Sequence, residues 1–206
     1  GSQDVLITVN PINDVPVALD VNINTDEDSP IIIDFSGSDI DEDDLTYIII
    51  DNPSNGIAVN NNNGTVTYTP DSNFNGEDMF TFIANDGILE SDNTATVFIV
   101  INEVNDSPVL NSISDVSFNE DESTVITVSG SDVDENMLTF SCESTDNIFC
   151  VADGSEITFT AFEHYFGEDS LMVTISDNEL LDSQKVFVQV LSINDAPFTL
   201  DNFNVI

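Results

Sequence analysis

Basic residues are almost absent from this sequence. Lys and Arg together number 1, which is Lys185, whereas Asp and Glu number 40, so the formal net charge is −39. Phosphate groups are bound by clustered Lys and Arg, and the composition therefore excludes nucleic acid and an anionic membrane surface as partners. No apolar run approaches the roughly 20 residues of a membrane-spanning helix. We expect no direct membrane insertion.

The residues of most catalytic and zinc sites are also scarce. There is one His, His164, there are two Cys, and there is no Trp. Two Cys and one His do not favour a zinc site, and we expect His164 to be a partly exposed structural residue rather than a catalytic base. No nucleophile elbow, phosphate-binding loop or metalloprotease helix is recognisable. We predict that the chain is not an enzyme.

The two cysteines, Cys142 and Cys150, are separated by a short segment, residues 143–149. We expect them to lie on successive segments across a hairpin. In an exported protein a disulfide is the expected state, with buried thiols as the alternative. A loop this short limits the stabilisation by a disulfide to about 2–3 kcal/mol.

One short motif occurs three times and organises the chain. Its copies are Asn13-Asp14-Val15-Pro16, Asn105-Asp106-Ser107-Pro108 and Asn194-Asp195-Ala196-Pro197, which begin at positions 13, 105 and 194. Proline restricts itself and the residue before it to extended geometry, so each copy predicts a stiff joint. A nearly fixed period of this size indicates a tandem array of similar domains.

The segments between the joints have the pattern of β-strands. They are short, rich in β-branched residues and bounded by turn residues, and none shows a sustained helical period. In the first repeat we predict strands over 17–23, 31–35, 45–50, 57–59, 65–69, 79–84 and 94–101. Seven short strands in such a length predict an all-β fold of two tandem immunoglobulin-like Greek-key β-sandwiches.

The second repeat follows the same plan as the first. Ser131-Asp132-Val133-Asp134-Glu135 repeats Ser38-Asp39-Ile40-Asp41-Glu42, and the motif Phe74-Asn75-Gly76-Glu77-Asp78 returns as Tyr165-Phe166-Gly167-Glu168-Asp169. We predict repeats at 13–104 and 105–193. Residues 1–12 are expected to be a tag scar and the last strand of a truncated repeat, and 194–206 a joint and the first strand of another.

In these motifs the sequence resembles the cadherin superfamily, and in particular the bacterial cadherin-like repeats of large surface and secreted proteins. The resemblance rests on Glu27-Asp28, on Asp39 to Tyr47, on Ala84-Asn85-Asp86-Gly87 and on the joint from Glu103 to Pro108. It covers both repeats almost end to end, although the joint is one residue shorter than the vertebrate cadherin linker. It implies Ca²⁺ bound between consecutive domains and a location outside the cell or at its surface.

The chemistry of the joint agrees with this implication. Ca²⁺ takes 6–8 oxygen ligands, and carboxylates two residues apart in extended chain, such as Asp132 and Asp134, point the same way. Carboxylates about 5 Å apart repel by roughly 3 kcal/mol at an effective dielectric constant of 20, which a bound cation reverses. By the resemblance, the ligands at the central joint are Glu27, Asp71, Glu103, Asn105, Asp106, Asp132, Asp134 and Asp177.

The two outer ends are expected to bind less well. The N-terminal half-site consists of Asn13, Asp14, Asp39, Asp41 and Asp86. At the C-terminal end only Glu120 and Asp195 remain, because Phe162 stands where the first repeat has Asp71. Scattered acids such as Glu90, Asp92 and Asp182 are expected to be merely solvated.

We therefore predict a calcium-stiffened spacer segment of a long bacterial adhesin, with neighbouring repeats of the same chain as partners. One alternative is a repeat that binds carbohydrate or makes homophilic protein contacts directly. Carbohydrate binding would need an exposed aromatic platform, for which Trp is missing and only three Tyr are present. A third hypothesis is that the protein is adapted to high salt, so that its acids maintain solubility and bind no specific ion.

Overall fold

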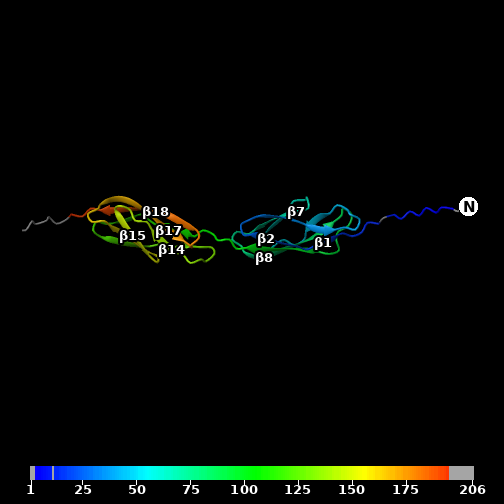
Figure 1. Ribbon diagram of the computed structural model, residues 1–206, viewed down its shortest axis with the longest axis horizontal. Coiled ribbons are helices and arrows are strands. Elements are labelled where there is room, and N and C mark those ends of the chain that lie inside the picture. The colour runs from blue at the N-terminus through cyan, green and yellow to red at the C-terminus, as the bar shows by residue number, and fades with distance from the viewer. Residues whose placement is uncertain (1–2, 11, 195–206) are drawn as a thin grey trace, which may run out of the picture. The chain divides into compact units, whose positions relative to one another are not determined.

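The computed structural model describes residues 3–10 and 12–194 (Figure 1). The chain divides into two compact units, which we call unit 1 (1–104) and unit 2 (105–206). Within the described ranges all regular structure is β-strand, which confirms the predicted fold class. Val5 to Val9, predicted as a strand, form none and are exposed. The strand predicted after Asn194 lies outside the described residues.

Each unit contains nine strands within the residues that the structure describes. In unit 1 they are β1 (Val17–Leu19), β2 (Val21–Asp26), β3 (Ile31–Asp34), β4 (Ser36–Ser38), β5 (Thr46–Ile49), β6 (Gly56–Asn60), β7 (Thr65–Pro70), β8 (Gly76–Asn85) and β9 (Ala95–Asn102). In unit 2 they are β10 (Val109–Leu110), β11 (Val116–Asn119), β12 (Ser123–Thr127), β13 (Gly130–Ser131), β14 (Thr139–Cys142), β15 (Ile148–Asp153), β16 (Glu156–Ala161), β17 (Gly167–Ser176) and β18 (Leu181–Leu191).

The strands of each unit form the layers of a sandwich. Unit 1 has a four-stranded sheet in the order β2-β9-β8-β5, a three-stranded sheet β3-β7-β6 and a short pair β1-β4. Unit 2 repeats this plan as β11-β18-β17-β14, β12-β16-β15 and β10-β13. Burial alternates along the strands, so one face of each sheet packs inward. The cores include Tyr68, Phe80 and Phe82 in unit 1 and Phe159 and Leu171 in unit 2.

The structure has more strands in each unit than the seven predicted, because a predicted strand can be divided into two parts that pair with different strands. The predicted strand 17–23 is divided at Asp20. Its first part, β1, pairs antiparallel with β4, whereas its second part, β2, pairs parallel with β9. The strand that begins at Ile31 likewise continues beyond Phe35 as β4. Hydrophobic periodicity does not report such a change of partner, because both halves alternate in the same way.

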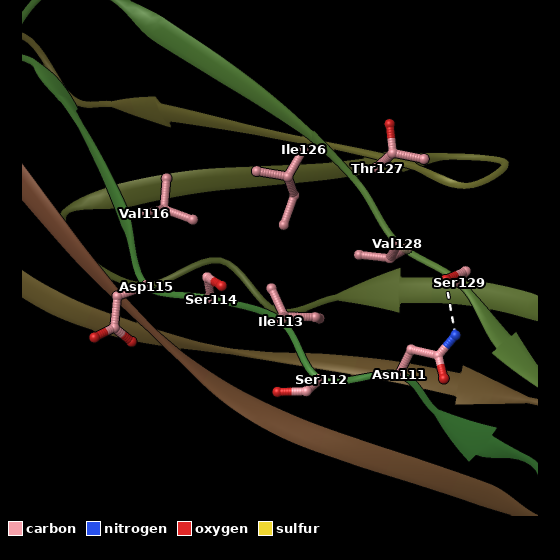
Figure 2. A pocket seen from close by; sticks show the side chains of 10 residues that line it. All are labelled: Asn111, Ser112, Ile113, Ser114, Asp115, Val116, Ile126, Thr127, Val128 and Ser129. Carbon is pink, nitrogen blue, oxygen red and sulfur yellow. Dashed lines mark hydrogen bonds between the residues drawn. The ribbon is translucent and has the colours of Figure 1, made fainter.

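Unit 2 differs from unit 1 at this crossover. Residues 111–115 separate β10 from β11, and the side-chain amide of Gln184 holds this segment by bonding both the N–H of Ile113 at 2.8 Å and its carbonyl oxygen at 2.7 Å. A crevice of about 360 Å³ lies between this segment and residues 126–129 (Figure 2). Asp115 is the one acid in its lining, so the crevice is separate from the acidic clusters described below.

The two cysteines form a disulfide. Contrary to the predicted hairpin, Cys142 lies on β14 and Cys150 on β15, which belong to different sheets. The bond therefore links the two layers of the sandwich rather than two strands of one sheet. By strand register, the positions of Cys142 and Cys150 correspond to those of Ile49 and Ala58 in unit 1.

Candidate metal centres

At the N-terminal end of unit 2, hydrogen bonds gather the joint and two acidic loops. The side-chain amide of Asn105 donates to Oδ2 of Asp177 at 2.8 Å, and the backbone N–H of Asp106 donates to Oδ2 of Asp134 at 2.7 Å. The N–H of Asp134 donates to Oδ1 of Asp132 at 2.9 Å. These five predicted ligands thus form one cluster, which we call the N-terminal cluster of unit 2.

Unit 1 repeats this network bond for bond. Asn13 donates to Oδ2 of Asp86 at 2.8 Å, the N–H of Asp14 donates to Oδ2 of Asp41 at 2.7 Å, and the N–H of Asp41 donates to Oδ1 of Asp39 at 2.8 Å. We call these five residues the N-terminal cluster of unit 1. The backbone is shaped alike in both units. Asp39, Asp41, Asp132 and Asp134 each accept these bonds through one oxygen, whereas Asp86 and Asp177 accept hydrogen bonds through both oxygens.

One position distinguishes the two clusters. In unit 2, Asn136 donates its side-chain amide to Oδ1 of Asn105 at 2.8 Å. Unit 1 has Asp43 at the equivalent position, and carboxylate oxygens of Asp39, Asp41 and Asp43 lie within 4.8 Å of one another. Our sequence reasoning missed both Asp43 and Asn136. The alternation of Asp39, Asp41 and Asp43 was the available signal for the former.

The pKa shifts follow from these contacts. The amide of Asn105 and the backbone N–H groups of Leu180 and Glu179 hold the pKa of Asp177 below its ordinary value, because they stabilise the carboxylate. Asp86 has a lowered pKa for the same reason. Desolvation, reinforced by the charges of Asp39 and Asp41, raises the pKa of Asp43. Oδ2 of Asp39 and Oδ2 of Asp132 are buried and have no hydrogen-bond partner.

At the C-terminal end of unit 1, Glu27 is only 3% exposed. Its Oε1 accepts the N–H of Val104 at 2.6 Å, whereas its Oε2 is buried without a partner. The exposed Asp71 belongs to a loop that is tied to the Glu27 turn, because the N–H of Asn73 donates to Oδ1 of Asp28 at 3.2 Å. Glu103 is exposed.

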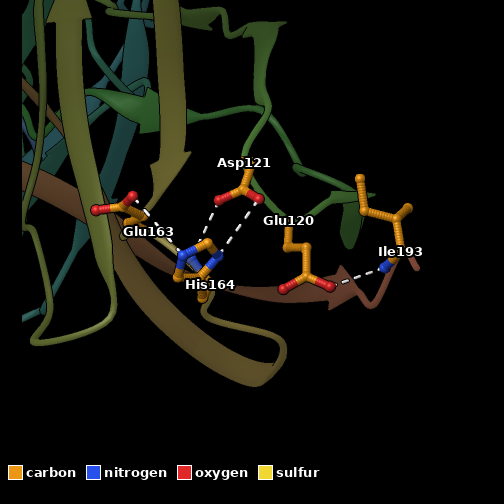
Figure 3. Close-up of polar contacts among 5 residues, drawn as sticks. All are labelled: Glu120, Asp121, Glu163, His164 and Ile193. Atoms are coloured by element: carbon orange, nitrogen blue, oxygen red, sulfur yellow. Dashed lines mark hydrogen bonds and ion pairs between the residues drawn. The ribbon is translucent and has the colours of Figure 1, made fainter. Parts of the chain in front are cut away.

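Unit 2 has the same backbone at its C-terminal end but different side chains (Figure 3). Glu120, also 3% exposed, accepts the N–H of Ile193 at 2.8 Å. The N–H of His164 donates to Asp121 at 3.1 Å, and its imidazole lies 3.7 Å from Asp121 and 3.7 Å from Glu163. The predicted ligand Asp195 lies outside the described residues.

Some acids serve the sandwich itself. Asp182, which we expected to be merely solvated, is half-buried, and its Oδ2 accepts the N–H of Leu110 at 2.9 Å. Asp78 accepts the N–H groups of Ser54 and Asn55 and the hydroxyl of Tyr68 at 2.8 Å. Such acids are already satisfied and are poor metal ligands.

The acids of the two N-terminal clusters, together with Glu27, have the chemistry that a hard divalent cation prefers. They offer only oxygen atoms, their backbone hydrogen bonds preset the loops, and three of them keep a buried oxygen that no hydrogen bond satisfies, in Glu27, Asp39 and Asp132. Ca²⁺ accepts such flexible sets of 6–8 oxygens, whereas structural zinc sites are four-coordinate and are built from Cys and His. Among the described residues, no helix could cross a membrane.

Comparison with known proteins places the fold. Residues 13–100 and 105–189 each match the family described as bacterial Ig domain. A curated relative, chitinase A of Pseudoalteromonas piscicida, is 31% identical over 121 residues, or 58% of this chain and 14% of the relative. Integrin beta-like protein A of Dictyostelium discoideum is 34% identical over 122 residues, or 50% of this chain and 6% of that protein. The chain therefore spans only a small part of both relatives.

A solved structure of human protocadherin-24, repeats EC1-2, has a TM-score of 0.57 with 17% identity, covering 87% of this chain and 99% of that one. The likeness is one of fold, and it confirms the cadherin-like sandwich. Repeats with such folds are typically extracellular, of the adhesion type and non-catalytic. With both repeats matched almost throughout, the chain belongs to the bacterial Ig domain family and carries two tandem copies of that domain.

Proposed function

We propose that this chain is a non-catalytic, calcium-binding spacer segment of a longer extracellular adhesin. Its ions are held at the ends of the two units, where they fix the loops and stiffen the connection between consecutive domains. The ligands are those of the two N-terminal clusters, together with Glu27, Asp71 and Glu103 at the end of unit 1. Glu120 and Asp195 form a poorer site.

The observation that carries this proposal is the environment of Glu27. A carboxylate that is 3% exposed has one oxygen without a partner, and the single Lys of the chain, Lys185, lies on β18 of the other unit. Burying an unpaired charge is costly unless a counter-charge or a metal ion is supplied. A divalent cation satisfies the free oxygen and the charge together.

Chain connectivity supports a shared role for the two kinds of cluster. Glu27 accepts a hydrogen bond from the N–H of Val104. The side-chain amide of Asn105, the residue after Val104, donates to Asp177. Ligands of unit 1 and of unit 2 are thus attached to consecutive residues of the joint. An ion bound by both groups would remove the freedom of the joint, so a chain of such units would remain extended.

Calorimetric titration of Ca²⁺ tests the proposal. We expect Asp134→Asn to weaken binding and to reduce the calcium-dependent rise in unfolding temperature. Asp153→Asn, which changes an exposed acid at the end of β15, should alter neither. The expected affinities are on the order of 10⁻⁴–10⁻³ M, as for extracellular modules.

Two outcomes would overturn it. If Na⁺ at matched ionic strength raises the unfolding temperature as much as Ca²⁺ does, the acids serve halophilic solubility. If Asp134→Asn and Asp153→Asn behave alike, ion binding is diffuse and the N-terminal cluster is no site.

A further inference from the structure

Unit 2 has a second crevice, of about 330 Å³, on the outer face of its four-stranded sheet. The ring of Phe187 on β18 lines it and is 58% exposed. The neighbours of this residue along the strand, Val186 and Val188, are buried, so strand alternation turns the ring outward. We call this hollow the Phe187 crevice. Its volume falls within the range of about 300–1,000 Å³ that is usual for small-molecule sites.

Polar side chains lie around the ring on three neighbouring strands. Ser117 on β11 is the register partner of Gln189 on β18, which is in turn the partner of Glu168 on β17. All three are exposed and line the crevice, as does Asp115 just before β11. Within the described residues, none of these four side chains has a hydrogen-bond partner. A hydroxyl, an amide and two carboxylates are therefore available to a ligand.

One wall of the crevice is fixed before any ligand arrives. It ends the segment 111–115, which is held because the side-chain amide of Gln184 bonds both the N–H and the carbonyl oxygen of Ile113. The same segment borders the crevice of Figure 2, so Asp115 lines both hollows. Unit 1 has only Asp20 between β1 and β2 and lacks such a wall. A wall that is already ordered reduces the entropy lost on binding.

The equivalent face of unit 1 has the aromatic ring without the polar row. By register, Phe98 corresponds to Phe187, and Val100 corresponds to Gln189. A hollow of about 280 Å³ beside Phe98 is lined by Met79 and has no amide from β9. The sandwich therefore does not require hydrogen-bonding groups around this ring, and their presence in unit 2 is a property of unit 2 alone.

We propose that the Phe187 crevice binds a neutral oligosaccharide. The C–H face of a pyranose ring packs against an aromatic ring, and sugar hydroxyls donate to carboxylates and exchange hydrogen bonds with amides and hydroxyls. The crevice offers both kinds of contact on adjacent strands. Trp is missing from the chain, and Phe187 supplies the aromatic platform instead.

Charge decides which class of sugar fits. The carboxylates of Asp115 and Glu168, in a chain of net charge −39, repel sulfated sugars and uronates. The one Lys of the chain, Lys185, places its ammonium 5.8 Å from the Phe187 ring centroid, and a single cation does not offset this field. A neutral sugar is indifferent to the net charge and uses the carboxylates as acceptors. A basic peptide would be attracted over the whole acidic surface rather than to this crevice.

NMR titration of the nitrogen-15-labelled chain in chelator tests the proposal, with cellotetraose and mannotetraose as neutral probes and a mannuronate tetrasaccharide as the anionic one. We expect at least one neutral probe to shift the amide signals of residues 115–117 and 187–189 at millimolar concentration, and the uronate to shift none. Added NaCl should leave the neutral binding unchanged, because no net charge is involved. None of the proposed metal ligands lines the crevice, so the result is independent of the proposed calcium sites.

Three variants locate the binding. Phe187→Ala should weaken it by at least about tenfold. Gln189→Val installs the residue that unit 1 already carries at this position, and the lost hydrogen bond should weaken binding by about three- to tenfold. The matched control, Phe98→Ala, removes the equivalent ring of unit 1 and should change nothing.

The proposal is overturned if neither neutral probe binds, or if the uronate binds as well as they do. It is also overturned if Phe187→Ala and Phe98→Ala have equal effects. Tetralysine is the probe for the competing class of partner. If it shifts the same signals in a salt-sensitive way while the neutral probes shift none, the crevice belongs to a basic peptide and not to a sugar.

Discussion

The C-terminal ends of the two units share a backbone conformation but carry different side chains in one loop. Glu27 and Glu120 are equally buried, and both accept an N–H from the chain that leaves the unit. The loop beside them carries Asp71 and Asn73 in unit 1, but Phe162 and His164 in unit 2. The contacts that shape the loop are therefore separate from those that would hold an ion, so one can vary without the other.

The backbone angles support this reading. Asn73 and His164 share a left-handed conformation, with φ of 56° and 59°, as do Asp28 and Asp121 with 54° and 58°. Asn and Asp adopt it more readily than most residues, and His is also enriched there. In unit 1 the backbone N–H of Asn73 donates to the side chain of Asp28, and in unit 2 the backbone N–H of His164 donates to the side chain of Asp121. Differences in ion binding between the two ends should consequently reflect side chains alone.

The largest difference between the units should come from the disulfide. Reduction, or Cys142→Ala with Cys150→Ala, should destabilise unit 2 by about 2–3 kcal/mol, because the unfolded chain regains its freedom. Unit 1 has Ile49 and Ala58 at these positions and should not respond. Calorimetry in reducing and non-reducing buffer would show one shifted and one constant transition. A shift of both would mean that the units do not unfold independently.

A second comparison concerns the acids that hold the loop before β6 and β15. Asp78 accepts the Tyr68 hydroxyl at 2.8 Å, and Asp169 accepts the Thr145 hydroxyl at 2.7 Å. Tyr68→Phe and Thr145→Val should each cost about 1–2 kcal/mol, with the larger cost in unit 1, where Tyr68 is fully buried. Urea unfolding of both variants measures the order. The reverse order would contradict the burial argument.

Asp169 adds a pH dependence to that comparison. Desolvation alone would raise its pKa, but hydrogen bonds from Thr145, Ser170 and Asn147 outweigh it and lower the pKa below 3.8. Since the folded pKa is depressed, its stabilisation is present above about pH 4 and is lost as pH falls through the folded value. Thr145→Val should shrink this acid-sensitive part of the unit 2 stability.

The calcium response should differ between the two buried glutamates. Without Ca²⁺, Glu27→Gln should leave unit 1 equally stable or stabilise it, because the variant removes an unpaired buried charge. With Ca²⁺ at tenfold excess over Kd, it should lose about 1.4 kcal/mol of ligand-dependent stabilisation per site. Glu120→Gln should change the calcium response less, since Phe162 supplies no oxygen. Melting curves in chelator and in Ca²⁺ check this, and equal responses would contradict the difference between the ends.

The smallest effect is expected at His164. Its side chain is 63% exposed, and exposed ion pairs contribute little. His164→Asn reproduces the residue of unit 1, keeps the left-handed backbone, and should change the stability by less than about 0.5 kcal/mol. A larger loss in the unfolding free energy would assign the imidazole a structural role that its exposure does not suggest.

Much of the fold was predictable because the signals are local. Each signal can be recognised in a short run of consecutive residues, whether it is the alternation of apolar residues, a turn or the recurring joint motif. The strand 94–101 before the second joint is an example. The residues that gather at Asn13 and Asn105 were predictable for the same reason, since short motifs that recur in both repeats contain them. Asp182 was misjudged, because its hydrogen bond to Leu110 joins residues far apart in sequence.

The sequence by itself determined the duplication, the all-β class and the position of the acidic joints, because repeats, periodicity and composition survive without tertiary contacts. Only the tertiary structure decided that β1 and β2 pair with different sheets, that the disulfide links the layers and that Glu27 is buried with a free oxygen. These features depend on which strands become neighbours, and strand pairing is a property of the folded chain as a whole.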